Sequence, residues 1–173
     1  MKSSDVLVRR LTSADAAGYR ALRLRAFREH PEAFTSSHAE EAIKPLASAQ
    51  QRLSDGSSCR VWGAFVENRL VGMVGLEREQ RQKVRHKGLI IGMYVAPEFA
   101  RRGIASTLLQ TLLAHARHTD IEMLNLTVTR GNDAAEQLYK ATGFKSWGVE
   151  PGAIKLNDQR FDKNHLYLTL APS

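Results

Sequence analysis

Residues 88–113 read GLIIGMYVAPEFARRGIASTLLQTLL, and this stretch decides the fold. Its first part, 88–95, is apolar on both faces, which is typical of a strand in the centre of a sheet. Pro97 ends the strand, because proline has no N–H to donate to a ladder. From Gly103 to His118 apolar residues recur at helical spacing, and the basic residues at the end suit the helix dipole. The segment therefore predicts a buried strand, a short turn and a long helix.

The turn, Ala100 to Ala105, has the features of an anion-binding site. The first amides of a helix have no partners within it, and the peptide dipoles add partial positive charge, so a phosphate is stabilised there. Gly103 is small enough to let a diphosphate approach the backbone, and Arg101 and Arg102 add charge. An ordinary strand-to-helix turn with solvated arginines would have the same residues. Both interpretations therefore stay open on this evidence.

The rest of the chain continues the succession of strands and helices. A strand over 6–11 precedes a helix that starts at Thr12 or Ser13 and stops before Pro31. The other predicted elements are a helical region over 37–53 that Pro45 weakens or kinks, a hairpin of strands 60–67 and 70–80, a strand over 123–129, a helix over 133–142, and strands around 145–149 and 165–170. This order predicts an α/β sheet with helices on its faces.

Length and composition favour a single domain over residues 1–173. The 173 residues are 43% hydrophobic, which is enough for one sizeable core. The N-terminus has no signal-peptide pattern, the nearly apolar stretch 88–96 is too short to cross a bilayer, and the one cysteine, Cys59, has no disulfide partner. We therefore expect a cytoplasmic protein without a membrane partner. His115 and His118 share a helix face, but no carboxylate pattern accompanies them, so we expect no metal.

The net charge of +7 predicts an anionic partner. Basic residues cluster over 81–87 and at Arg101–Arg102, and neither cluster is interleaved with aromatic residues on which bases could stack. A small phosphorylated ligand is therefore favoured, and a nucleic acid is the weaker alternative.

Two segments resemble the cofactor-binding motifs of the GNAT acetyltransferase superfamily. The first is GMYVAPEFARRGIASTLL, residues 92–109, and the second is LNLTVTRGNDAAEQLYKATGF, residues 124–144. The second contains the family's Asn-x-x-Ala turn and its Leu-Tyr-x-x-x-Gly-Phe helix end. The resemblance implies a GNAT-like fold, with a mixed, mostly antiparallel central sheet flanked by helices. It also implies acetyl-CoA as co-substrate. The family's Gln or Arg at the first motif position is Ala100 here, and Arg101 is expected to supply the missing charge.

The resemblance assigns the cofactor contacts residue by residue. The backbone groups of Met93 and Val95 would bind the pantetheine arm, and the N–H of Val95 would stabilise the thioester oxygen. Asn132 would touch the arm from the other side, although it fits a helix N-cap equally well. The residues that would surround the pyrophosphate are Arg101, Arg102, Gly103, Ile104, Ala105, Ser106 and Thr107.

Tyr139 is the candidate general acid. It matches the family's tyrosine by position, and a phenol can protonate the coenzyme A thiolate. Spacing alone favours core packing, because Tyr139 shares a helix face with Ala135 and Leu138. The resemblance favours catalysis.

The general base is harder to identify. Histone-acetylating relatives carry a glutamate where this chain has Gly88 or Leu89, so that base is missing. Glu77 is the candidate, because it lies on the neighbouring predicted strand among apolar residues, where burial would raise its pKa. Glu79 and a water chain without a dedicated side chain are the alternatives.

The predicted function is direct transfer of an acetyl group from acetyl-CoA to a primary amine of a small molecule or a protein. A domain that senses acyl-CoA without turnover is one alternative. A basic protein that binds nucleic acid is a weaker one. A homodimer is a candidate assembly.

Overall fold

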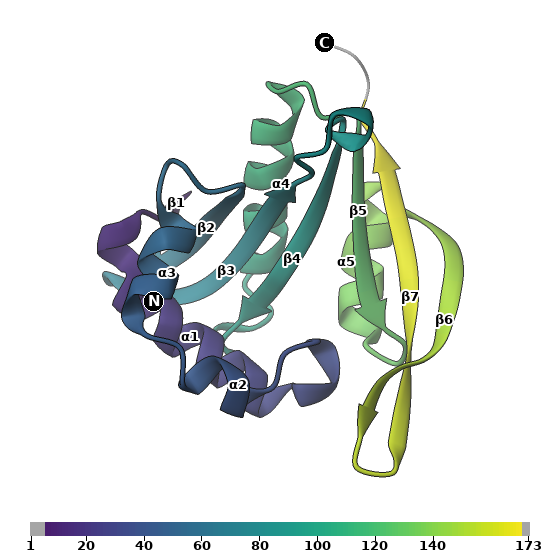
Figure 1. The fold of residues 1–173 in the computed structure, drawn as a ribbon, viewed down its shortest axis with the longest axis horizontal. Coiled ribbons are helices and arrows are strands. Elements are labelled where there is room, and N and C mark those ends of the chain that lie inside the picture. The colour runs from purple at the N-terminus through teal and green to yellow at the C-terminus, as the bar shows by residue number, and fades with distance from the viewer. Residues whose placement is uncertain (1–5, 171–173) are drawn as a thin grey trace.

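A mixed sheet forms the centre of the protein, whose computed structural model describes residues 6–170. Within them, seven strands lie in the order β1-β2-β3-β4-β5-β7-β6, and every neighbouring pair is antiparallel except β4 and β5 (Figure 1). The strands are β1 (Leu7–Arg10), β2 (Cys59–Val66), β3 (Arg69–Arg78), β4 (Lys87–Val95), β5 (Met123–Thr129), β6 (Lys145–Leu156) and β7 (Gln159–Thr169). This is the mixed, mostly antiparallel sheet that the sequence predicts.

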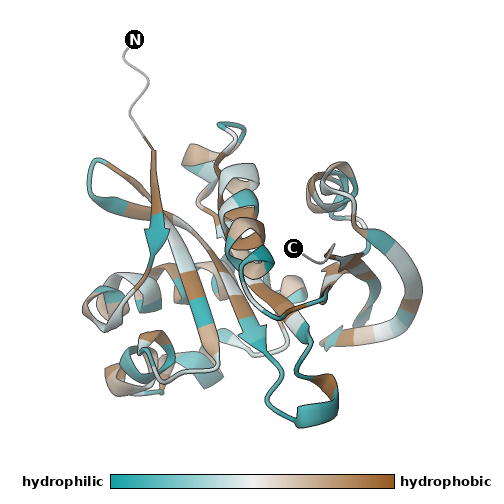
Figure 2. Cartoon of the chain, turned by 90° about the horizontal axis from the view of Figure 1, so that it is seen from above, coloured by the Kyte–Doolittle hydropathy of each residue, from teal (hydrophilic) through white to brown (hydrophobic). Residues whose placement is uncertain are grey.

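Helices cover both faces of the sheet (Figure 2). The helices are α1 (Ala16–Glu29), α2 (His38–Ala42), α3 (Leu46–Leu53), α4 (Ile104–Arg117) and α5 (Asp133–Thr142). One buried cluster joins α1 and α3 to the sheet, and a second joins α4 and α5 to its other face. No helix within residues 6–170 has the length and apolarity that a membrane span requires.

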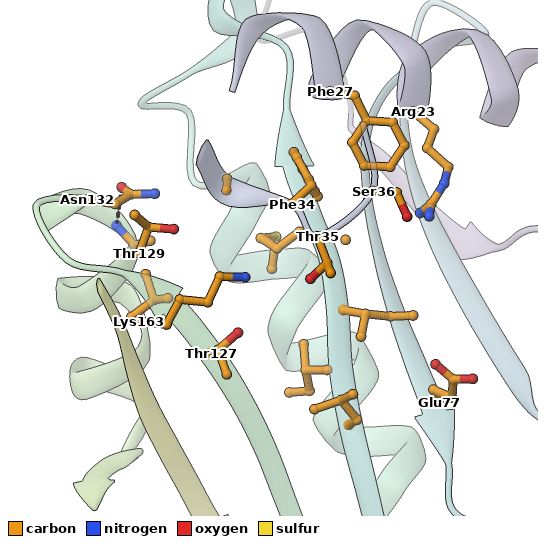
Figure 3. Close-up of a pocket in the computed structure, with 18 of the residues that line it drawn as sticks. Arg23, Phe27, Phe34, Thr35, Ser36, Glu77, Thr127, Thr129, Asn132 and Lys163 are labelled. Atoms are coloured by element: carbon orange, nitrogen blue, oxygen red, sulfur yellow. Dashed lines mark hydrogen bonds between the residues drawn. The ribbon is translucent and has the colours of Figure 1, made fainter. Parts of the chain in front are cut away.

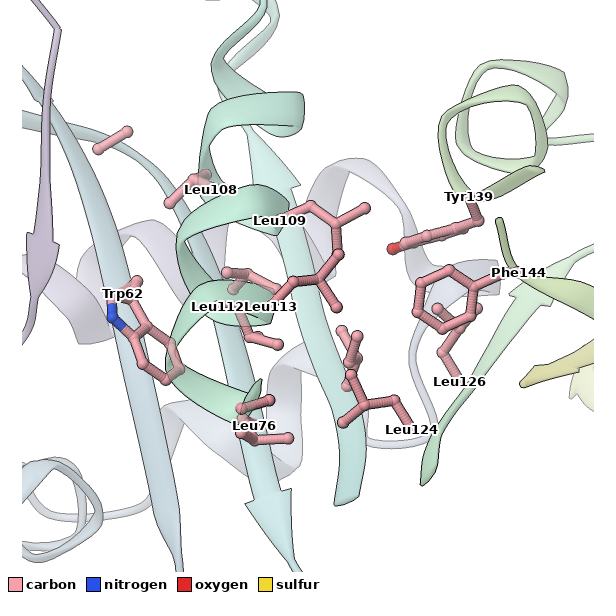
Figure 4. Close-up of a cluster of buried hydrophobic side chains, with 14 of the residues drawn as sticks. Trp62, Leu76, Leu108, Leu109, Leu112, Leu113, Leu124, Leu126, Tyr139 and Phe144 are labelled. Carbon is pink, nitrogen blue, oxygen red and sulfur yellow. The ribbon is translucent and has the colours of Figure 1, made fainter. Parts of the chain in front are cut away.

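Helix α4 packs on the sheet through leucines that share one helix face. Leu108, Leu109, Leu112 and Leu113 are each 0% exposed (Figure 4). Full burial of a leucine side chain contributes about 1.5–3 kcal/mol, so this face anchors the helix firmly. The helix spans Ile104–Arg117, one residue shorter at each end than the predicted 103–118, and Gly103 is its N-cap.

The bounds of β5 and α5 are those that the sequence predicts. Asn132 caps α5 by accepting a hydrogen bond from the Ala135 N–H at 3.2 Å. Gly143 ends the helix in the left-handed conformation, with φ of 104°. Pro45, in contrast, does more than kink the second helical region, because it separates α2 from α3.

The last two strands are longer than the sequence predicts. Expected around 145–149 and 165–170, they extend to a hairpin over Lys145–Leu156 and Gln159–Thr169. Pro151 and Gly152 mark a strand end in the sequence, but the sheet absorbs them at a register shift between Glu150 and Ile154. Since β6 lies at the edge of the sheet, a proline there need not break the ladder to β7.

Strands β4 and β5 separate along their length. They pair only at Lys87↔Met123, Gly88↔Leu124 and Leu89↔Asn125. Beyond these pairs the two strands diverge toward the end where α1 and α2 lie (Figure 1). The register between β3 and β4 also shifts there, and Gly92 has a φ of 63°. A bulge of this kind bends the strand that carries it, which is consistent with the divergence.

Candidate functional site

A cavity of about 430 Å³ lies where β4 and β5 diverge. Its walls come from β4 over 89–93, β5 over 127–129, helix α1 and the segment 33–36. The Thr129 hydroxyl donates to the Glu32 carbonyl at 3.0 Å, which ties this segment to β5. Figure 3 shows side chains from both diverging strands and from α1 converging on the same space. Elements far apart in the sequence therefore build one site.

Of the residues that sequence reasoning singled out, some line this cavity and others do not. Met93, Asn132, Tyr139 and Glu77 contribute to the lining. Val95 and the segment 101–107 lie outside it, because the chain leaves the cavity at the C-terminal end of β4. The predicted residues therefore fall into two groups: some line the cavity, and the others belong to a separate turn beside it.

The turn before α4 presents a row of unbonded amides. Within residues 6–170, the backbone N–H groups of 101–106 have no acceptor, and the first bond runs from the Thr107 N–H to the Gly103 carbonyl at 3.0 Å. Arg101 and Gly103 both have positive φ, 61° and 73°. A Cβ added at Gly103 would meet nothing within 4 Å, so the space in front of the turn is open. Together with the helix dipole, these amides form an anion-binding concavity.

Charged side chains fix the turn. Arg25 on α1 donates to both carboxylate oxygens of Glu98, each at 2.8 Å, and this pairing lowers the pKa of Glu98 to about 2. Arg69 bonds the same carboxylate at 3.2 Å. The guanidinium of Arg102 lies over the Phe99 ring, 5.2 Å from its centroid. Arg101 is exposed and remains available to an anion.

The backbone of Val95 has no strand partner on one side. The Ala96 N–H donates to the Val71 carbonyl at 2.8 Å, and Gly72 lies opposite Val95. Since bonded and non-bonded pairs alternate in an antiparallel ladder, the N–H and C=O of Val95 point away from β3. They face the side from which β5 has diverged, where an extended ligand can pair with them.

The side chain of Tyr139 packs in the core and also borders the cavity. Its side chain is 5% exposed and packs edge-on against Phe144, with ring centroids 5.7 Å apart. Burial raises the pKa of the phenol, so it stays protonated at physiological pH. The hydroxyl has no hydrogen-bond partner within residues 6–170 and points across the core toward α4 (Figure 4). It is therefore a proton donor without an acceptor among the described residues.

Glu77 is placed differently from the sequence-based expectation. Its side chain is exposed, so the burial on which that expectation rested is absent. The reason is its position near the end of β3, beyond the buried run 71–76. It is nevertheless the one carboxylate among the residues that line the cavity. Glu79 lies outside the lining and beside Arg81, 3.5 Å away.

Lys163 is a site residue that the sequence did not reveal. It lies on β7 opposite Thr129, is only 8% exposed, and extends its amine into the cavity (Figure 3). No described carboxylate lies within 4.0 Å of it. Burial lowers the pKa of its amine, and the charge of Glu150, opposite it on β6, opposes this shift without cancelling it. Sequence reasoning started this strand at His165, which left Lys163 in a predicted loop.

The two histidines considered as a metal pair have other roles. His115 lies against Trp62, with ring centroids 5.1 Å apart, and His118 contacts the Ala114 carbonyl at 2.7 Å. In the part of the chain that the structure describes, no group of three or more His, Cys, Asp or Glu side chains is arranged to hold a metal ion.

The chain is similar to acetyltransferases in sequence. The sequence model of the Acetyltransferase (GNAT) family matches residues 21–144. N-acetyltransferase 8 from Homo sapiens is 35% identical over 97 residues, which are 56% of this chain and 42% of the human protein. The match thus spans less than half of that curated relative.

Solved structures extend the similarity to nearly the whole fold. An acetyltransferase of the GNAT family from Streptococcus pneumoniae has a TM-score of 0.84 at 25% identity, covering 96% of this chain and 100% of that one. A protein from Salmonella typhimurium, solved with its cofactor acetyl-CoA, has a TM-score of 0.80 at 19% identity, covering 98% and 96% of the two chains. The second likeness concerns the fold alone.

We predict that Lys163→Met stabilises the unliganded protein. Burial of this cation destabilises the fold, and the charge of Glu150, opposite it on β6, offsets only part of the cost. Its removal should therefore raise the free energy of unfolding by about 1–3 kcal/mol at neutral pH. The folded-state pKa lies below that of the unfolded chain, about 10.4. The unfolded state therefore binds the extra proton, and the advantage of the variant should shrink as pH rises through this window.

Urea unfolding at several pH values measures this effect. Lys155→Met, at an exposed position of the same hairpin, is the matched control and should change stability little. A Lys163→Met protein less stable than the parent at neutral pH would show that the amine is compensated in the fold.

Proposed function

The chain belongs to the GNAT acetyltransferase family, and from that premise we propose that it transfers the acetyl group of acetyl-CoA directly to a primary amine of a small molecule or a protein. The observation that carries the proposal is the combination of a cavity between diverging strands with an anion-binding turn at the end of one of them. The acetyl-CoA in a structural relative supports the choice of co-substrate.

The turn fits the diphosphate of the co-substrate. Unbonded N–H groups over 101–106 point to an open space, and charge-assisted hydrogen bonds from backbone amides to phosphate are strong. Arg101 is free to add its charge, whereas Arg102 is partly engaged on Phe99. We infer that the backbone does most of the binding, so Ala100 in place of the family's Gln or Arg is compatible with it.

The diverging strands fit the pantetheine arm. The backbone of Val95 faces the side that β5 has left, and Met93 and Asn132 lie on the walls of the cavity. An extended amide-containing chain can pair with the free edge of β4 as an added strand would. The Val95 N–H then stabilises negative charge on the thioester oxygen during attack. Asn132 also caps α5, and the two roles use different atoms of its amide.

Tyr139 and Glu77 fit the two proton transfers. The amine nitrogen forms the new bond to the acetyl carbon while the carbon–sulfur bond breaks. The leaving sulfur then takes a proton, and the protonated, unpaired hydroxyl of Tyr139 is suited to donate it. The attacking amine must lose a proton, and Glu77 is the carboxylate in the cavity lining that can accept it. Since Glu77 is exposed, we propose that it acts through water.

We predict that acetyl-CoA stabilises the protein and that Gly103→Val abolishes most of the effect. At one hundred times the dissociation constant, ligand binding should add about 2.7 kcal/mol to the free energy of unfolding. A branched side chain at a φ of 73° is strained and occupies the space in front of the turn, so the dissociation constant should rise about tenfold or more.

The measurement is a thermal melt in increasing acetyl-CoA. Gly152→Val is the matched control, since Gly152 also has a positive φ, 59°, but lies in β6 away from the turn. Wild-type affinity in Gly103→Val would place the diphosphate elsewhere, and melts insensitive to acetyl-CoA would remove the proposed function altogether.

Tyr139→Phe should lower kcat by about 10²- to 10⁴-fold while the dissociation constant of acetyl-CoA changes little. The substitution removes the hydroxyl and keeps the ring that packs on Phe144. Coenzyme A release under conditions where chemistry limits the rate is the readout. An unchanged kcat would assign Tyr139 to the core alone.

Glu77→Gln should lower kcat by about 10²-fold or more and flatten the acidic limb of the pH profile of kcat/KM, because the amide cannot accept a proton. Glu79→Gln, outside the cavity lining, is the control and should keep the parent profile. If both variants behave alike, a water chain without Glu77 removes the proton. A protein that binds acetyl-CoA and releases no coenzyme A with any amine would instead be a sensor domain.

A further inference from the structure

The turn before α4 contains a residue in an unfavourable backbone conformation. Arg101 has a φ of 61°, which costs a residue other than glycine about 1–3 kcal/mol and persists only where its surroundings impose it. Backbone hydrogen bonds end just before it. The Ala100 N–H donates to the Pro97 carbonyl at 3.0 Å, whereas the N–H groups of 101–106 have no acceptor within residues 6–170. Side chains beside the turn therefore have to hold its conformation.

Glu98 is the first of these side chains. It lies three residues before Arg101, in the short helical segment Pro97–Phe99. Arg25 on α1 donates to both of its carboxylate oxygens at 2.8 Å, and Arg69 on β3 bonds the same carboxylate at 3.2 Å. Most exposed ion pairs contribute little, and a bidentate pair within a network is the exception. The two arginines therefore fix Glu98 relative to both α1 and β3.

Phe99 provides a second anchor beside the first. Its ring packs against both buried clusters. The guanidinium groups of Arg69 and Arg102 lie over the ring, 5.8 Å and 5.2 Å from its centroid. Arg102 directly follows Arg101, so the residues on both sides of the strained position are engaged.

Arg25 is itself oriented from α1. Glu29, one helical turn further along, accepts a hydrogen bond from the Arg25 Nε at 2.6 Å and another from the Tyr94 hydroxyl. Arg25 belongs neither to the cavity lining nor to the turn. Its contact with the turn runs through Glu98.

We propose that Arg25 is a positioning residue for the co-substrate, acting through Glu98 to hold the turn before α4 in the conformation that binds the diphosphate. This inference rests on the proposed function. Without Arg25 every proposed diphosphate contact is still present, but the turn populates other conformations as well. The apparent dissociation constant then rises by the factor by which the competent fraction falls.

The test measures coenzyme A binding by isothermal titration calorimetry in Arg25→Met and Glu98→Ala. Each substitution should raise the dissociation constant about threefold to tenfold. The double variant should be no weaker than the weaker single variant, because both substitutions break the same contact. At saturating acetyl-CoA, kcat should change by less than about twofold, since Val95 and Tyr139 are proposed to act at the thioester and are not altered.

A second readout needs no ligand. In the unliganded parent, the NMR order parameters of the backbone amides of 101–103 should be near the rigid value of about 0.85, and in Arg25→Met they should fall toward about 0.6. Arg9→Met is the matched control. Arg9 also forms a bidentate pair, with Asp15 at 2.8 and 2.9 Å, but it lies on the edge strand β1. This variant should keep the parent affinity and order parameters.

Three results would overturn the inference. One is parent affinity in Arg25→Met or Glu98→Ala, and another is an equal loss of affinity in Arg9→Met. The third is a fall in kcat without a change in affinity. Failure of the proposed function is distinct, because it would appear in the parent protein itself as an absence of coenzyme A binding.

Discussion

The pairing of β4 with β5 ends after Leu89 and Asn125, and the site depends on this divergence. Two strands of one sheet that separate leave backbone N–H and C=O groups without partners, which is unfavourable unless water or a ligand binds them. Here the divergence opens a cavity and frees the edge of β4 near Val95. The core tolerates it because α4 packs its buried leucines on the strands from one face and α1 covers the other.

The same helix, α1, connects both parts of the site. Its Arg25 binds Glu98 in the turn that follows β4, and its Glu29 accepts a hydrogen bond from the Tyr94 hydroxyl on β4. On the same helix, Arg23 and Phe27 line the cavity. Helix α1, which lines the cavity, is therefore held by hydrogen bonds and ion pairs to the strand and turn proposed to hold the co-substrate. A shift of helix α1 would therefore move the strand and the turn, and a shift of these would move α1.

The net charge of +7 conceals how unevenly the charged side chains are paired. Around the turn, arginines are paired with carboxylates, as Arg25 and Arg69 are with Glu98. Inside the cavity, Lys163 and Arg52 have no such partner among the described residues. Burial lowers the pKa of the Lys163 amine, and the charge of Glu150, opposite it on β6, offsets this only in part.

Local chemistry made much of this protein predictable from its sequence. Proline after an apolar strand, glycine before a periodic helix, and Asn132 before α5 act over a few residues, and each has the predicted role in the structure. The succession of strands and helices along the chain follows from the same patterns, whereas the mixed, mostly antiparallel sheet was implied by the resemblance to the GNAT superfamily. The segment 100–107 could be singled out because free amides at a helix start depend only on that helix.

Tertiary structure decided the rest, because burial depends on which distant segments meet. Glu77 lies among apolar residues in sequence, yet the end of β3 leaves it exposed. Lys163 lies in a polar stretch, yet pairing of β7 with β5 buries it opposite Thr129. The length of the β6–β7 hairpin depends on a bulge that accommodates Pro151. The cavity exists because the pairing of β4 with β5 stops partway along the two strands. Contacts between strands far apart in the chain set all of these, and no local pattern of residues encodes them.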